Sequence, residues 1–547
     1  MLVQEDNFSS KVQRAINRLS IWFSQWGTSK MWWAVFIAGA IFYGLTAQSS
    51  VSWQDCGRFQ WRILTGDYFW PEGVAANAHP MFVVIGKIVQ QIPIGDVLWR
   101  LSWASGLGMA VALANFAVVV TLLTGRRWVA ILFTAILGLA HANWWLATIA
   151  QTYTWNLAGM TLELWLMINL VKKPSWWIVT ALAFVNGFTL SIHGQALLIF
   201  PIDAALALYL IYKKKLPVWS LGTASVAYVV GATMFIVMIV KLAVSSGSIG
   251  FAIYDAFIGV GAQMLSNTKL VTGYTIPNAE ISSLSFVNIL FPLALVGWFK
   301  FRKLLGNIVA LAFGALTLID LIWWIHLDTP EIFTYMIPVL AMIALAAAVG
   351  ASYLIEFSSA WRRTVVVLGL ASLVCMPTVY GTLPNILRGI GVEVHRTRML
   401  PFRDEMRYWI TPWKQNEKSA QLFGEAALKQ AAPNGIILTD MTPFSVLQVV
   451  QSMNSDFQGI GIRFDQWPES VLPRYDKNPE KFRQLLGDRP LYIVSPIPGQ
   501  GYIPGDEGIL HDAEVQKQPG EVLYRVTWKN VLLDVGRQQH LLPSGKN

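Results

Sequence analysis

The strongest constraint in this sequence is a series of long apolar segments that recur through residues 31–383. Each is close to the ~20 residues that a helix needs to cross a bilayer, and about eleven can be distinguished. The chain is 54% hydrophobic and only 13% charged, which is too apolar for a water-soluble protein of 547 residues. The sequence therefore predicts a polytopic α-helical membrane protein. The predicted spans lie near residues 31–47, 99–123, 128–143, 154–171, 175–191, 195–212, 217–243, 284–299, 304–325, 332–356 and 364–383.

The connections between these segments alternate in charge. Basic clusters occur in every second connection, and the intervening connections are long or nearly free of such clusters. Because cytoplasmic loops are enriched in Lys and Arg, we expect the basic connections and the N-terminus to be cytoplasmic. These clusters explain the formal net charge of +9 without nucleic-acid binding. They are Arg126 with Arg127, Lys172 with Lys173, Lys213 to Lys215, Lys300 with Arg302 and Lys303, and Arg362 with Arg363.

Two further segments precede the second span. Residues 1–30 place apolar side chains opposite basic ones at helical spacing, which is typical of an amphipathic helix on the cytoplasmic leaflet or on the protein's own loops. Residues 79–98 are apolar but contain Lys87 and hold too short an apolar run for a span. A span here would invert every later loop. We therefore expect an outer juxtamembrane helix within a first outer loop, residues 48–98.

The composition changes to that of a soluble protein from about residue 384. Helical and strand patterns alternate there, which predicts a small extracytoplasmic α/β domain over 384–547. Neither buried strand is followed by a glycine-rich phosphate loop, so nucleotide binding is not expected. The predicted helices are 417–431, 443–453 and 478–487, and the predicted strands are 435–440, 490–496 and 521–528.

Polar residues at the outer ends of the spans are the candidates for a functional site, because a polar group at that depth is costly without a partner or a task. One boundary histidine alone is usually an interfacial residue with a hydrogen bond, whereas several on one face favour a site. Four of the seven histidines lie at such boundaries: His79, His141, His193 and His326. Within the spans, three acidic residues are expected to pair with other helices or to line a cavity, in a structural role: Glu163, Asp203 and Asp320.

The order and spacing of five motifs resemble the GT-C glycosyltransferases. The similarity is to a bacterial family of membrane proteins related to the vertebrate transmembrane O-mannosyltransferase and, more distantly, to the protein O-mannosyltransferases. It covers residues 30–213 well and the rest in outline. The motifs are DCGRF at 55–59, AHP at 78–80, IPIGDVLWRLSWASGL at 92–107, WWLATIAQTYTWN at 144–156 and LSIHGQALL at 190–198.

This resemblance implies transfer of a sugar from a polyprenyl-phosphate-linked donor to an acceptor at the outer face of a bacterial inner membrane, with no cofactor besides that donor. Asp55 occupies the position of the general base that takes the acceptor's proton. The leaving phosphate needs cations or hydrogen-bond donors. Arg100 has a second interpretation, as a snorkelling anchor. The candidate substrate-binding residues are Arg58, His79, Arg100, Gln151, Tyr153, Asn156, His193 and His326.

The chain departs from the family pattern at three places. The family usually has Glu where this chain has Arg58 and Gln151, and Pro-Gly where it has Met81 and Phe82. Because divalent metals prefer anionic oxygens, we expect no metal at this site.

Two hypotheses for the function follow. One is an active enzyme with Asp55 as its base, and the other is a catalytically inactive relative that serves as a structural or docking subunit of a membrane complex. A transporter is disfavoured, since no paired halves with matching Gly or Pro interruptions occur. The expected partners are membrane lipids, the polyprenyl-phosphate sugar, and a protein acceptor or a partner in a membrane complex.

Overall fold

The computed structural model describes residues 18, 21–23, 25–68, 78–258, 275–327, 331–392, 400–464, 486–495 and 513–528. The chain divides into a helical unit, residues 1–396 with Phe402–Gln421, and a C-terminal unit, Thr397–Pro401 with Leu422–Asn547. The sequence placed this division at 384. The structure places it later because helix α18, Ser359–Gly389, continues past that point and residues 402–421 fold against the helical unit. The helix expected within residues 1–30 lies largely outside the described residues.

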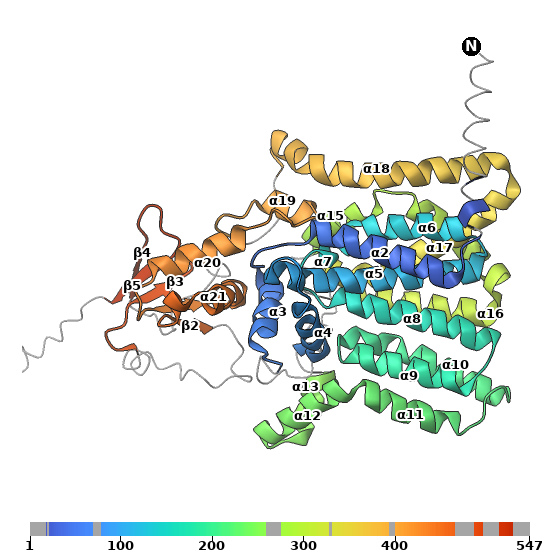
Figure 1. Ribbon diagram of the computed structural model, residues 1–547, viewed down its shortest axis with the longest axis horizontal. Coiled ribbons are helices and arrows are strands. Elements are labelled where there is room, and N and C mark those ends of the chain that lie inside the picture. Colours follow the sequence, from blue (N-terminus) through green and yellow to red (C-terminus); the bar gives the residue numbers. More distant parts are fainter. Residues whose placement is uncertain are drawn as a thin grey trace, which may run out of the picture. The chain divides into compact units, whose positions relative to one another are not determined.

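The helical unit consists of helices, several of them long, that run side by side in Figure 1. Shorter helices α3, α4, α7, α13 and α15 gather at one end of it, and α3 and α4 cross the direction of the long helices. The elements are α2 (Thr28–Thr46), α3 (Gln54–Thr65), α4 (Pro80–Gln90), α5 (Val97–Thr124), α6 (Arg127–Leu139), α7 (His141–Ala147), α8 (Tyr153–Lys172), α9 (Trp176–Leu190), η2 (Gly194–Leu198), α10 (Phe200–Tyr212), α11 (Ser220–Gly231), α12 (Thr233–Ser246), α13 (Ile249–Phe257), α15 (Thr275–Ser283), η3 (Leu284–Phe286), α16 (Leu290–Ile325), η4 (Ile332–Met336), α17 (Ile337–Phe357), α18 (Ser359–Gly389) and α19 (Glu405–Ile410).

Helix α5 shows how the sequence defines one of these long helices. The Asp96 carboxylate caps its start by accepting a hydrogen bond from the Leu98 N–H at 2.8 Å. Gly125 ends it in a left-handed conformation, φ 68°, which glycine adopts without steric cost. Its 28 residues extend for ~42 Å at 1.5 Å per residue, more than the ~30 Å of a bilayer's hydrocarbon core. The helix is therefore long enough to cross a membrane.

Glycine pairs let several helices approach closely. A Cβ atom on Gly297 of α16 would lie 1.8 Å from the Ala346 carbonyl oxygen of α17, and one on Gly231 of α11 would lie 2.3 Å from the Phe184 carbonyl oxygen of α9. Small residues at helix contacts are typical of membrane bundles, where packing rather than water exclusion drives association.

Five described helical segments are long and apolar enough to cross a membrane, and up to eight if each bent pair of helices forms one span. The predicted span 128–143 is bent by 70° between α6 and α7, and the predicted span 217–243 is bent by 64° between α11 and α12. The predicted span 284–299 begins in η3 and continues into α16 across a bend of 80°, and the predicted span 304–325 lies within α16, which Gly306 interrupts with φ 76°. A polytopic helical membrane protein is confirmed, and the count of eleven spans stays a prediction.

Three of the five basic clusters meet at the end of the helical unit where α5 terminates. Arg126 forms an ion pair with Glu356, N to O 3.0 Å, and Lys172 donates to the Leu122 carbonyl oxygen at 3.0 Å. Lys300 lies 4.5 Å above the Tyr353 ring, one helical turn before Glu356. These three clusters, which are far apart in the sequence, therefore share one end, and the sidedness of the chain in the membrane stays a prediction.

Residues 402–421, the closing segment, pack against the other end of the unit. The Trp145 indole N–H donates to the Tyr408 carbonyl oxygen at 3.2 Å, and the Thr148 hydroxyl donates to the Pro412 carbonyl oxygen at 2.7 Å. The backbone N–H of Lys414 donates to the Thr46 carbonyl oxygen at 2.8 Å. The closing segment thus joins the ends of α2 and α7.

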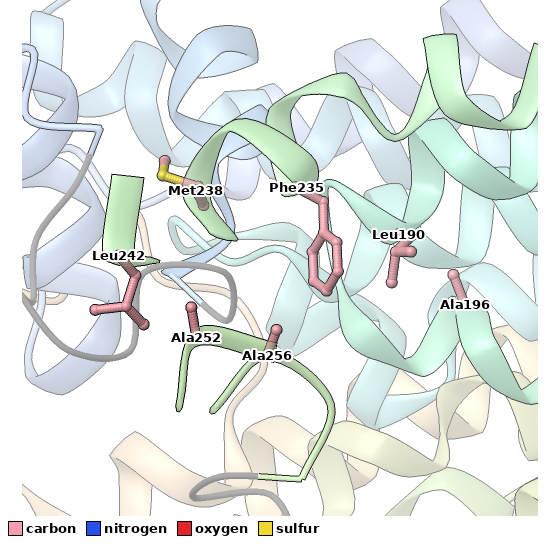
Figure 2. Close-up of a cluster of buried hydrophobic side chains, with 7 residues drawn as sticks. All are labelled: Leu190, Ala196, Phe235, Met238, Leu242, Ala252 and Ala256. Carbon is pink, nitrogen blue, oxygen red and sulfur yellow. The ribbon is translucent and has the colours of Figure 1, made fainter. Parts of the chain in front are cut away.

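A buried apolar cluster supports the turn between α9 and η2, which contains His193. Leu190 and Ala196 flank this turn, and Phe235 extends from α12 toward Leu190 in Figure 2. Met238 and Leu242 of α12 and Ala252 and Ala256 of α13 complete the cluster.

The C-terminal unit is an α/β layer domain, as predicted. Its sheet has the order β2-β1-β3-β5-β4, in which β1 pairs in parallel with β2 and β3, and β5 pairs antiparallel with β3 and β4. Strands β1, β3 and β5 confirm the predicted strands, whereas β2 and β4 were not predicted. Most of the predicted helix 478–487 lies outside the described residues. The elements are α20 (Ser419–Gln430), β1 (Ile436–Thr439), α21 (Met441–Met453), η5 (Ser455–Phe457), β2 (Gly461–Phe464), β3 (Leu491–Ile493), β4 (Ala513–Gln516) and β5 (Tyr524–Trp528).

Candidate functional site

The first candidate group lies on helix α3, which carries the DCGRF motif. Asp55 and Arg58 are three residues apart on this helix, so they share a face, and Arg58 Nη2 lies 3.2 Å from Asp55 Oδ1. The Asp55 side chain is 49% exposed, whereas that of Arg58 is 11% exposed. Gln54, just before Asp55, has a φ of 57°, which is unusual for a residue with a Cβ. A carboxylate open to solvent therefore lies beside a largely buried guanidinium.

The second group joins two motifs that are far apart in the sequence. The rings of His79 and His193 stack with centroids 4.9 Å apart and an interplanar angle of 10°. His79 also has a positive φ, 56°, and precedes α4. The Phe59 ring of α3 lies 5.8 Å from the His79 ring. Strained backbone of this kind persists where the surroundings require it, often at functional sites.

The hydrogen bonds of the two histidines define their tautomers. The Ile192 carbonyl oxygen, 2.8 Å from His79 Nδ1, can only accept, so Nδ1 of His79 carries the proton. The Gln195 backbone N–H donates to His193 Nδ1 at 3.1 Å, so this nitrogen has a lone pair. Burial lowers the pKa of His79 well below its ordinary value, with smaller contributions from His193 and Arg58, and lowers the pKa of His193 to about 4. Both rings are neutral at neutral pH.

These tautomers give the Nε2 atoms of the two rings opposite roles. In a neutral ring with its proton on Nδ1, His79 Nε2 is an acceptor, and by the same logic His193 Nε2 is a donor. The stacked pair can thus accept one proton and donate another hydrogen bond within a single cluster.

Two tyrosines complete what we call the histidine–tyrosine cluster, His79, Tyr153, His193 and Tyr335. The Tyr153 ring lies 4.9 Å from that of His193 and 5.0 Å from that of Tyr335, centroid to centroid. Asp55 interacts electrostatically with both tyrosines, and Arg58 with Tyr335 and His79. The α3 pair and the cluster therefore belong to one site.

Gln151 lies beside the α3 motif, at the position where the family usually has Glu. Its side-chain amide donates to Cys56 Sγ at 3.4 Å, and its backbone pairs with the Ser105 hydroxyl. Burial raises the pKa of the Cys56 thiol well above its usual value, and the nearby Glu331 and Asp55 raise it further. The thiol therefore stays protonated. Glu331, which is far from Cys56 in the sequence, brings a second carboxylate to this site.

Asn156 and Gln195 form the inner wall of the site. The Asn156 amide donates to Gln195 Oε1 at 3.0 Å, and the Gln195 amide donates to the Tyr335 carbonyl oxygen at 3.2 Å. Both side chains are buried. They hold α8, η2 and η4 together and so fix the positions of Tyr153, His193 and Tyr335.

Three sequence candidates have other partners. Arg100 donates to the carbonyl oxygens of Ile94 and Gly95 at 3.1 Å, which supports the anchor interpretation. His326 contacts the Ile322 carbonyl oxygen of its own helix at 2.7 Å. His141 is buried, and its Nε2 contacts the Trp409 carbonyl oxygen at 2.9 Å. None of these contacts reaches the histidine–tyrosine cluster.

Sequence reasoning missed the closing segment, which brings a cation to the α3 motif. Lys414 is 2% exposed and donates to the carbonyl oxygens of Tyr408 and, at 2.8 Å, Thr411. Burial lowers its pKa to about 7, and it interacts electrostatically with Cys56. The aromatic run at 408–413, which lies between the last predicted span and the predicted strands, was a signal that this stretch packs against the helical unit rather than joining the C-terminal domain.

Among the described residues, no group of three or more His, Cys, Asp or Glu side chains is arranged to hold a metal ion. The groups present offer one open carboxylate, a neutral histidine acceptor, a histidine donor and buried cations. Such a set can remove a proton from a hydroxyl and stabilise an anionic leaving group.

Comparison with solved structures identifies the fold. ArnT from Cupriavidus metallidurans bound to undecaprenyl phosphate matches with a TM-score of 0.54 and 13% identity, covering 90% of this chain and 98% of that one. The apo state of the same protein matches with a TM-score of 0.46 and 14% identity, over 85% and 93% of the two chains. The oligosaccharyltransferase of Archaeoglobus fulgidus matches with a TM-score of 0.42 and 11% identity, over 79% and 62%. No family model and no curated protein matches the sequence.

The match to the lipid-bound ArnT extends over almost the whole of both chains, so the likeness includes the helical unit and is not limited to one motif. The chain has the fold of the GT-C membrane glycosyltransferases, as the sequence motifs predicted.

Proposed function

We propose that this protein transfers a sugar from a polyprenyl-phosphate-linked donor to an acceptor hydroxyl at the outer face of the membrane. The observation that carries the proposal is the meeting of three motifs, around Asp55, His79 and His193, at the end of the helical unit away from the basic clusters. The fold it shares with ArnT, whose structure contains undecaprenyl phosphate, supports the class of donor.

In the proposed reaction, Asp55 takes the proton of the acceptor hydroxyl. Its half-exposed carboxylate is the accessible one of the α3 pair, as a base that meets an incoming acceptor must be. The acceptor oxygen then forms a bond to the anomeric carbon of the sugar, while the bond from that carbon to the phosphate oxygen breaks. The electron pair of the broken bond leaves with the lipid phosphate.

The leaving phosphate needs positive charge and donors. Arg58 presents a guanidinium at the site, His193 presents an Nε2–H, and Lys414 interacts electrostatically with Cys56. A guanidinium in place of the family's usual Glu adds a positive charge to the site. In the proposed reaction, Arg58 and the other protein side chains balance the negative charge of the leaving lipid phosphate.

The ion pair between Arg58 and Asp55 also favours the alternative, a catalytically inactive GT-C relative that serves as a docking or structural subunit. In that case the Arg58 guanidinium would remain paired with Asp55, and the carboxylate would not be free to accept a proton. A transfer assay separates the two proposals.

The test uses the full-length protein in lipid nanodiscs with radiolabelled polyprenyl-phosphate sugars and an acceptor mixture. We expect Asp55→Asn to reduce transfer by about 10²-fold or more, the range for loss of a general base. The control is Glu356→Gln. Glu356 also pairs with an arginine and is 61% exposed, but it lies at the opposite end of the unit.

Undiminished transfer by Asp55→Asn would refute the assigned base. No transfer by the wild-type protein, together with a stoichiometric partner that copurifies, would support the inactive relative instead. If the protein binds a polyprenyl phosphate but transfers no sugar, the proposed lipid-binding site stands and the proposed reaction is wrong.

A further inference from the structure

Three polar side chains meet inside the helical unit, apart from the histidine–tyrosine cluster. Glu163 of α8, Asn186 of α9 and Asp203 of α10 are 0%, 0% and 7% exposed. The Asn186 amide donates to Glu163 Oε2 at 3.3 Å and to the Ala196 carbonyl oxygen at 3.0 Å. The side chains of Glu163 and Asp203 are in hydrogen-bond contact. We call these three residues the acidic pair and its amide.

The three residues lie at similar depth. Glu163 is nine residues before Lys172, and Asp203 is ten residues before Lys213, at the ends of their helices. Asn186 is ten residues after Trp176, where α9 begins. At 1.5 Å per residue these separations are ~15 Å, half of the ~30 Å hydrocarbon core. The acidic pair therefore lies near the middle of the membrane.

The polar atoms of this group that have no other hydrogen-bond partner are all oxygen acceptors. Apart from the contact between the two acids, Asp203 Oδ1 and Oδ2, Glu163 Oε1 and Asn186 Oδ1 are buried without a hydrogen-bond partner, and no ion pair joins either acid in the described part of the chain. Two carboxyl groups in contact in a medium of low dielectric constant cannot both be ionised, so they hold at least one proton between them. A buried acceptor without a donor is costly. The site thus lacks hydrogen-bond donors and a compensating positive charge.

A cavity adjoins this group. It has a volume of about 270 Å³ between α9, α10 and α11, far more than the ~10–15 Å³ of cavity that one water molecule requires. Asn186 and Asp203 contribute to its polar part together with Ser225 and Tyr228. Its remaining lining residues are apolar, among them Leu182, Phe200 and Val229. A ligand that fills it has one polar end and a short apolar body.

We propose that this cavity binds a membrane-soluble primary amine, with its nitrogen at Asp203 and Asn186 and its apolar body between α9, α10 and α11. The neutral amine enters from the lipid and takes the proton of the acidic pair on its nitrogen lone pair. An ammonium and a carboxylate result, so the net charge in the membrane does not change. The ammonium supplies the donors that the unpartnered oxygens lack. This site is independent of the proposed sugar transfer.

The experiment is a titration of the full-length protein in nanodiscs with hexylamine, followed by infrared absorption of protonated carboxyl groups in D₂O. We expect a saturable loss of a carboxylic acid band and a gain of a carboxylate band. Hexan-1-ol, which has the same body without a basic nitrogen, should leave the acid band in place. Binding measured by calorimetry should be at least about tenfold weaker in Asp203→Asn, because a hydrogen bond to a charged group is lost.

Two further variants distinguish a specific loss of amine binding from a general loss of folding. Asp255→Asn is the matched control, since Asp255 is also a buried carboxyl, 4% exposed, but it lies on α13 and does not line this cavity. It should leave the hexylamine response unchanged. Ala224→Leu fills the proposed cavity without altering an acid and should weaken binding while the acid band remains.

An unchanged carboxylic acid band in the wild-type protein at saturating hexylamine would overturn the proposal. The role of Glu163 and Asp203 would then be to link helices. An equal response in Asp203→Asn, or full binding by Ala224→Leu, would place the amine elsewhere and would also overturn it.

Discussion

The two ends of the helical unit treat polar groups in opposite ways. At the basic end, Arg126 and Glu356 pair at 3.0 Å with side chains that are 30% and 61% exposed. At the other end, His193 and Lys414 are buried, and His79 and Tyr153 are half-buried. Exposed pairs of the first kind contribute little to stability, because water and salt screen them. Buried polar groups are costly unless each has a partner.

This difference indicates which end has a specific task. The basic end needs only its charge for the role that we expect of it, which is to orient the chain in the membrane. The other end retains strained residues, Gln54 and His79, and two histidines whose tautomers are fixed by backbone groups. Such features reduce stability and are retained where function requires them. We therefore expect substitutions near the histidine–tyrosine cluster to have larger effects than substitutions at the basic end.

The largest effect is expected from His79→Asn. Asn tolerates positive φ and can donate to the Ile192 carbonyl oxygen as His79 Nδ1 does, but it lacks the acceptor at the position of Nε2. We expect sugar transfer to fall by about 10²-fold, with little change in thermal stability. Lys214→Asn is the control, because Lys214 also has positive φ, 55°, and belongs to a basic cluster. Equal sugar transfer by His79→Asn and Lys214→Asn would show that His79 Nε2 has no role in the reaction.

Acid should destabilise the site end through the buried histidines. An unfolded chain binds a proton on histidine below about pH 6.5, but folded His193 binds one only below about pH 4. The unfolded state therefore gains protons first, and the free energy of unfolding falls as the pH drops through this window, by about 3 kcal/mol. Denaturant unfolding at pH 6.5 and pH 4 measures this loss. His193→Gln should reduce the loss, and an equal loss in that variant would contradict the assignment.

The sequence predicted much of the fold because apolar length and loop charge are local signals. The helical membrane unit, the charge pattern and the α/β domain follow from such patterns. The bends at α6–α7 and α11–α12 and the course of residues 402–421 depend on packing between distant segments, which no local pattern contains. For this reason the division at 384 was set too early.

The candidate site was predicted in part for the same reason. His79, Tyr153 and His193 were found from motifs and do meet, and Asp55 and Gln151 lie beside them. Tyr335 and Lys414 were not predicted, since their contacts with these motifs cross more than a hundred residues of sequence.

Lys414 provides a prediction in the alkaline range. An unfolded lysine keeps its proton to about pH 10.5, whereas burial lowers the pKa of Lys414 to about 7. The unfolded state binds more protons between these values, so the free energy of unfolding should rise by about 2 kcal/mol from pH 7 to pH 9. Lys414→Met should remove this rise, as measured by denaturant unfolding in detergent at both pH values. The same rise in the variant would mean that another group titrates.

The smallest effect is expected at the basic end, from Glu356→Gln. This substitution removes the ion pair with Arg126 but leaves both positions in contact with solvent. Exposed pairs of this type contribute about 0.2–1 kcal/mol, and salt weakens them, so we expect a loss in this range that disappears in 1 M salt. Sugar transfer should be unchanged, because the pair lies at the end of α5 opposite the histidine–tyrosine cluster. A loss as large as that caused by acid at His193 would show that the basic end also depends on buried polar contacts, and the contrast between the two ends would no longer hold.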